Sequence, residues 1–121
     1  MQDNKVILDT NAILRYILDD MPEQADIVEK TIAEREIIIL PEVIAEVVYI
    51  LTKYYNIERK ESIENIIDFL DEINEKNVFL RLALKTFSET NIDFVDSILY
   101  AYSKQYDIFS FDKKLNELIS K

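Results

Sequence analysis

Short apolar runs alternate with segments of helical periodicity along the whole chain, and this alternation constrains the fold more than any other feature. The runs cover residues 6–8, 36–40, 78–80 and 108–111. We expect helices between and after them, over residues 12–18, 22–33, 41–54, 56–74, 83–88, 94–105 and 113–119. Strands that alternate with helices are typical of α/β domains with a parallel sheet. We therefore predict one α/β domain over residues 1–121, with a short, mainly parallel central sheet of about four strands flanked by helices.

Three residue types are absent from the chain, and their absence excludes several kinds of site. Without glycine there is no phosphate-binding loop or dinucleotide fingerprint, and tight turns have to use Asn, Asp and Pro. Without histidine and cysteine there is no imidazole acid–base catalysis, no Ser–His or Cys–His nucleophile and no thiolate or imidazole zinc site. Catalysis would depend on carboxylates, hydroxyls, Lys or Arg, and oxygen ligands favour Mg²⁺ or Mn²⁺.

The charge balance is strongly acidic, with 24 Asp and Glu against 14 Lys and Arg, a formal charge of −10. Such a charge argues against nucleic acid as a partner unless a cation or a local basic rim compensates. Candidates for that rim, which fit a solvated surface equally well, are Arg15, Lys53, Arg81, Lys85, Lys104, Lys113 and Lys114. The N-terminal sequence does not resemble a signal peptide and no apolar run is long enough for a membrane span, so we expect a cytoplasmic protein.

Four acidic residues occupy positions that could converge at one edge of the sheet. Asp9 and Asp112 follow the first and last predicted strands, where ligands bind in open α/β sheets. Glu46 and Asp96 lie at the boundary between the apolar and polar faces of their helices. Each also has an ordinary explanation. Asp9 and Asp112 can cap the helices that follow, Asp96 suits the positive end of a helix dipole, and Glu46 can simply be solvated. A cluster of ionised carboxylates is costly without a counter-ion, and a divalent cation relieves that repulsion.

Four segments, in this order, resemble those of a PIN-domain ribonuclease. They read "VILDTNAILRYILDD", "LPEVIAEVVYIL", "DFVDSILYAYSKQ" and "IFSFDKKL". The resemblance covers the full length, and the chain has the size of the stand-alone, VapC-like toxins of type II toxin–antitoxin systems. It implies a PIN-like fold and carries the four acids of the family onto Asp9, Glu46, Asp96 and Asp112.

The resemblance further implies metal-dependent hydrolysis of RNA phosphodiester bonds. On this hypothesis Asp9, Glu46 and Asp96 hold Mg²⁺ or Mn²⁺, partly through water, while Asp112 tunes that ion or holds a second one. Ser110 takes the place of a hydroxyl residue that precedes the last acid, and Asp93 is an accessory acid or only a helix cap. A homodimer and a neutralising antitoxin protein are also implied. The absence of glycine, notably before the last strand, departs from the family pattern and is expected to alter a turn.

Two other functions compete with this reading. A catalytically inactive PIN fold would act only as a binding module. A receiver-type phospho-acceptor domain shares the size, the acidity and an aspartate after the first strand. It also needs an adjacent second acid there and an acceptor Asp after the third strand, whereas this chain has Asp9-Thr10-Asn11 and "NVFLRL".

Overall fold

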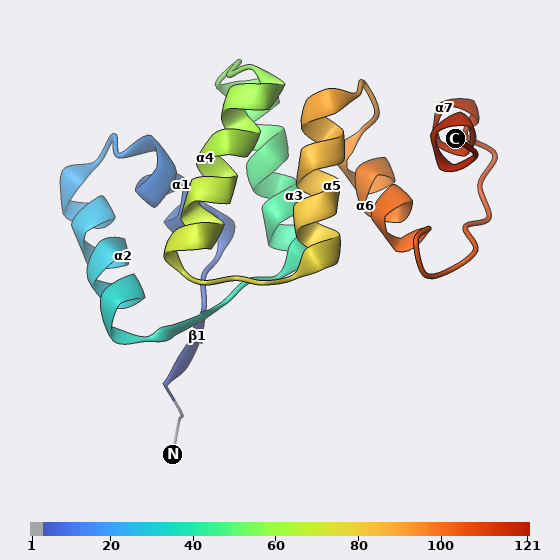
Figure 1. Cartoon of the computed structure of the whole chain (residues 1–121). Coiled ribbons are helices and arrows are strands. Elements are labelled where there is room, and N and C mark those ends of the chain that lie inside the picture. Colours follow the sequence, from blue (N-terminus) through green and yellow to red (C-terminus); the bar gives the residue numbers. More distant parts are fainter. Residues whose placement is uncertain (1–3) are drawn as a thin grey trace.

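The computed structural model describes residues 4–121 as a mainly helical domain built around a small parallel sheet. The strands are β1 (Lys5–Ile7) and β2 (Glu36–Ile38), paired in the register Val6 to Ile37. The helices are α1 (Thr10–Leu18), α2 (Pro22–Glu34), α3 (Pro41–Tyr49), η1 (Ile50–Tyr54), α4 (Arg59–Glu72), α5 (Val78–Glu89), α6 (Phe94–Tyr102) and α7 (Lys113–Ile119). Helices α2 and α7 lie at opposite ends of the molecule, with α3, α4 and α5 between them (Figure 1).

The prediction of an α/β fold with parallel strands is confirmed, but the predicted sheet of about four strands is not: within residues 4–121 it has two. Residues 78–80, predicted as a strand, form the first turn of α5. The side chain of Asn77 caps that helix by accepting hydrogen bonds from the N–H groups of Phe79 and Leu80, at 3.0 and 3.1 Å. A three-residue apolar run does not distinguish strand from helix, and here the cap decides. Residues 108–111 have no strand partner within the described chain.

Proline and short polar residues set the remaining boundaries. Pro22 and Pro41 occupy the first turns of α2 and α3, as predicted. Asp19, Asn56 and Asn74 take the positive φ values of 50°, 55° and 61° that glycine would otherwise supply. The prediction that Asn56 caps the next helix is therefore wrong: the residue lies in a turn, and α4 begins at Arg59.

One turn of π-helix, η1, follows α3 and rotates the face that the sequence predicts to be buried. The N–H of Tyr55 donates to the carbonyl of Ile50 five residues earlier. Val47, Val48 and Leu51 are buried as expected, whereas Tyr54, predicted on the same apolar face, is exposed. The extra residue in the turn shifts every later side chain around the axis.

The core lies where α1, α3, α4 and α5 meet the sheet. Its largest fully buried side chains are Phe69, Ile13, Ile44, Leu51, Ile66, Leu70 and Leu84. Two polar clips fix the helices around it. The guanidinium of Arg59 donates to the carbonyls of Phe87 and Ile92 and stacks over the Phe87 ring. None of the helices in the described chain combines the length and apolar character of a membrane-spanning segment.

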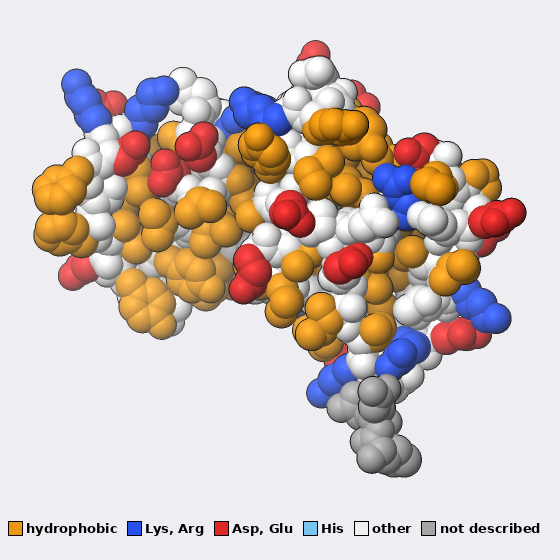
Figure 2. All heavy atoms as spheres, turned by 180° about the vertical axis from the view of Figure 1, so that it is seen from behind, with side chains coloured by type: hydrophobic (Ala, Val, Ile, Leu, Met, Phe, Trp, Pro, Cys, Tyr) orange, Lys and Arg blue, Asp and Glu red, His pale blue; other side chains and the backbone are white. Residues whose placement is uncertain are grey.

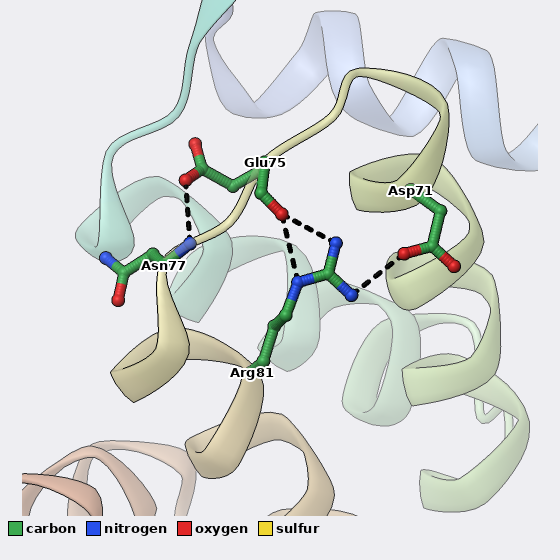
Figure 3. A network of polar contacts seen from close by, with 4 residues as sticks. All are labelled: Asp71, Glu75, Asn77 and Arg81. Carbon is green, nitrogen blue, oxygen red and sulfur yellow. Dashed lines mark hydrogen bonds and ion pairs between the residues drawn. The ribbon is translucent and has the colours of Figure 1, made fainter.

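The second clip is centred on Arg81 and closes the connection between α4 and α5 (Figure 3). The Arg81 side chain donates two hydrogen bonds to the carbonyl of Glu75, at 2.9 and 2.6 Å, and forms an ion pair with Asp71 at 2.8 Å. The carboxylate of Glu75 accepts the N–H of Asn77 at 3.1 Å. Arg81 therefore fixes the turn that carries the cap of α5.

Candidate functional site

Asp9 and Glu46 line one shallow, open pocket of about 360 Å³. Asp9 lies two residues after β1, and Glu46 lies in the second turn of the helix that follows β2. The pocket is completed by Thr10, Asn11, Leu14 and Ile50. It therefore occupies the carboxyl end of the two parallel strands, where α/β folds place ligands.

The Asp9 side chain also caps α1. Its Oδ1 accepts a hydrogen bond from the N–H of Ala12 at 2.8 Å. The cap uses one carboxylate oxygen and fixes the side chain beside the pocket, which leaves Oδ2 for a ligand. The two explanations predicted for Asp9, cap and ligand, are thus compatible in one conformation.

Asp96, Asp93 and Asp112 form a second acidic group, around the start of α6. Burial raises the pKa of Asp96, and the charges of Asp112 and then Asp93 raise it further. Asp112 caps α7, since its Oδ1 accepts from the N–H of Leu115 at 2.8 Å. Asp93 precedes α6, but its side chain makes no capping hydrogen bond; its carbonyl accepts from the N–H and hydroxyl groups of Ser97.

The four predicted site residues therefore lie in two groups, Asp9 with Glu46 and Asp96 with Asp112. Within residues 4–121, no three acidic side chains lie close enough together to hold one metal ion. The structure thus pairs the acids without assembling all four, and the assignment of these residues to a metal site stays a prediction.

An oxygen-rich pair of this kind still suits a hard cation. Mg²⁺ keeps several water ligands and is commonly bound by one or two carboxylates together with phosphate oxygens of a substrate. Asp9 and Glu46 are both solvent-exposed, so neither carboxylate would have to lose its full hydration before a cation binds. Thr10 and Asn11 add oxygen atoms at the same pocket, and sequence reasoning did not select them as ligands. Their adjacency to Asp9 was the available signal.

The predicted basic rim is only partly available. Arg15 is largely buried and pairs with Asp20 at 3.2 Å, and Arg81 serves the turn described above. Lys104 lies over the ring of Tyr100, 4.5 Å from its centroid. Lys53, Lys85, Lys113 and Lys114 are exposed. On the face opposite that of Figure 1, acidic side chains are scattered among apolar ones and basic groups lie towards the margins (Figure 2).

Comparison with known proteins gives one match. The chain matches a family described as "PIN domain" over residues 6–119. Neither the curated proteins nor the solved structures contain a significant match to it.

Proposed function

Because this chain belongs to the PIN-domain family, a nuclease-type fold, we propose that it is a metal-dependent endoribonuclease. The observation that carries the proposal is the pairing of Asp9 and Glu46 in one open pocket at the carboxyl ends of the parallel strands. Family membership supports a hydrolase that acts on nucleic acid and replaces the receiver-type alternative. Mg²⁺ or Mn²⁺ is the cofactor that the donor set favours.

In this mechanism Asp9 and Glu46 would provide the first carboxylate ligands, with Oδ2 of Asp9 directed to the ion and Oδ1 kept in the cap. A bound ion would lower the pKa of a water ligand and neutralise charge that develops on the phosphate. Thr10 and Asn11 are placed to orient a water molecule or a phosphate oxygen at the same pocket. Its openness suits a polynucleotide, which has to reach the site without passing through a narrow entrance.

Asp96 and Asp112 would complete the site from the second acidic group. The raised pKa of Asp96 shows that its ionised form is disfavoured by burial and by neighbouring negative charge. A cation that reached this carboxylate would reverse both effects, because opposite charge favours the ionised form. We propose that Asp96 is the third ligand and that Asp112 tunes the ion or holds a second one.

The direct test is cleavage of a defined RNA by the purified protein with Mg²⁺ or Mn²⁺. Asp9→Asn and Glu46→Gln should each reduce the rate at least about 100-fold, because loss of a catalytic electrostatic contact costs that much in other enzymes. Glu61→Gln, which alters an exposed acid of α4, is the matched control and should retain full activity. Full activity of the Asp9→Asn variant, or cleavage in excess EDTA, would refute the proposal.

We also infer that the nuclease acts as a toxin restrained by an antitoxin protein. The basis is the full-length PIN match on a stand-alone chain and an anionic pocket that can accept a basic side chain. Expression of the wild-type chain should arrest growth, and expression of the Asp9→Asn variant should not. A catalytically inactive binding module, the second candidate, would leave growth equal in the two cultures and would gain no stability from metal.

A further inference from the structure

The segment between α6 and α7 has the character of a strand without a partner. We call residues 107–112 the arm. Within the described chain, no backbone N–H or carbonyl group of residues 107–111 bonds to another backbone group. Unpaired, extended backbone of this kind is a template for pairing with a sheet edge.

Two aromatic rings of the arm face solvent on the same side. Phe109 and Phe111 are 88% and 92% exposed, and their ring centroids lie 5.4 Å apart. Alternate residues of an extended chain share a face, so the pair forms one apolar patch. Apolar side chains project from the end of the molecule that carries α7 (Figure 2). Adjacent exposed Phe side chains are unusual on a monomer and typical of an interface.

The arm is anchored at both ends to its own chain. Helix α7 packs against α6, and Leu115 of α7 is completely buried. Asn116 donates to the carbonyl of Ser110 at 2.8 Å, and the Ser110 hydroxyl accepts from the N–H of Asp112 at 2.9 Å. Folding the arm back onto its own sheet would require α7 to leave α6 and expose Leu115. A second molecule can approach the arm as it stands.

The sheet offers a suitable edge at β1. The carbonyl of Asn4 accepts from the N–H of Glu36, so Asn4 and Val6 direct their backbone groups towards β2, and Ile7 directs its groups to the opposite edge. The Ile7 side chain is 56% exposed. A parallel strand aligned so that Asp112 lies beside Asp9 would place Ser110 opposite Ile7.

We propose that two copies of the chain exchange their arms, each arm adding a strand to β1 of its partner. The exchange places the Asp96 and Asp112 group of one copy beside the Asp9 and Glu46 pocket of the other. The two acidic groups, separate within one chain, then form one composite site. The exchange itself stands on the arm and the sheet edge, whereas a catalytic role for the composite site rests on the proposed function.

Disulfide trapping tests the exchange without reference to activity, because the chain contains no cysteine. An Ile7→Cys chain and a Ser110→Cys chain of different tag lengths should give the mixed disulfide as the main product on mild oxidation. Ile27→Cys, on the exposed face of α2, replaces Ile7→Cys in the control and should give at least ten times less. A mixed disulfide no stronger than the control, or an intrachain disulfide in the monomeric double variant, would overturn the exchange.

The mass in solution provides a second test. The wild type should run as a dimer of 14.3 kDa chains, and Phe109→Ser/Phe111→Ser as a folded monomer with unchanged circular dichroism. Ile27→Ser/Val78→Ser alters two similarly exposed side chains elsewhere and should remain dimeric. A monomeric wild type, or a dimeric arm variant, would overturn the proposal.

Complementation tests the composite site. Asp9→Asn and Asp112→Asn chains, each inactive alone, should regain about a quarter of wild-type cleavage after mixing and subunit exchange. Half of the dimers are then mixed, and one of their two sites is intact. No recovery, with active wild type, would overturn the composite site. A cross-linked wild-type dimer without ribonuclease activity would overturn the proposed function and leave the exchange standing.

Discussion

The two roles assigned to Asp9, helix cap and metal ligand, can be separated by two substitutions at one position. Asn is as good an N-cap as Asp, so Asp9→Asn should keep the hydrogen bond to the N–H of Ala12, whereas Asp9→Ala removes it. Both substitutions remove the carboxylate charge from the pocket shared with Glu46. Stability without metal should therefore follow the cap, and stabilisation by metal should follow the charge.

The magnitudes can be worked from the structure. Loss of an N-cap typically costs about 1 kcal/mol of the free energy of unfolding. In Asp9→Asn, the lost attraction to the helix dipole, about 0.3–1 kcal/mol, is offset by relief of repulsion from Glu46, up to about 1 kcal/mol between exposed carboxylates. In EDTA, Asp9→Asn should therefore lie within about 0.5 kcal/mol of wild type, and Asp9→Ala about 1 kcal/mol below Asp9→Asn. For a domain of this size that gap is a Tm difference of roughly 3–6 °C.

Urea unfolding followed by circular dichroism, in EDTA and then in excess Mn²⁺, measures both effects. At ten times the dissociation constant, a ligand that binds only the native state adds about 1.4 kcal/mol. Wild type should show that gain, and neither variant should. Equal stabilities of the Asn and Ala variants in EDTA would refute the cap, and metal stabilisation of Asp9→Asn equal to wild type would refute the ligand role.

Three further predictions concern polar contacts away from Asp9. Arg81→Met should lower the free energy of unfolding by about 1–2 kcal/mol in urea titrations, because it removes hydrogen bonds from a charged donor; Asp71→Asn, which removes only an exposed ion pair, should cost less than about 1 kcal/mol. Asp96→Asn should raise the Tm of the metal-free protein at pH 7, since the native state binds the Asp96 proton more tightly than the unfolded chain does and loses stability as the pH rises above 3.8; scans at pH 3 should show no gain. Arg59→Lys should lower the Tm, because an ammonium group cannot reproduce both carbonyl contacts and the stacking on Phe87.

Local chemistry made much of the fold predictable from the sequence. Pro22 and Pro41 mark helix starts through their fixed φ, and Asp9 and Asp112 satisfy the free N–H groups of the helices that follow them. These signals act over three or four residues, within the range that a sequence pattern can resolve. The use of Asn and Asp at positive φ, expected from the lack of glycine, is confirmed at Asp19, Asn56 and Asn74.

The errors arose where distant or subtle effects decide the structure. Asn77 captured residues 78–80 for a helix, and the π-helical turn of η1 moved Tyr54 out of the core. The position of the arm depends on how α7 packs against α6, a contact that leaves no periodic signal in the sequence. For the same reason the sequence could indicate which acids gather at strand ends but not that they would lie in two groups within one chain.

Binding of Mn²⁺ to the purified protein tests the central claim most directly, because it needs neither the RNA nor an antitoxin. In a calorimetric titration, the wild type should bind the ion, and Asp9→Asn/Glu46→Gln should lose at least about 90% of that affinity, the tenfold minimum seen when a metal site loses even a supporting contact. Glu61→Gln/Glu64→Gln removes the same charge from the exposed face of α4 and should bind as the wild type does. Equal affinities in all three proteins, or no binding to the wild type, would contradict a metal site at Asp9 and Glu46.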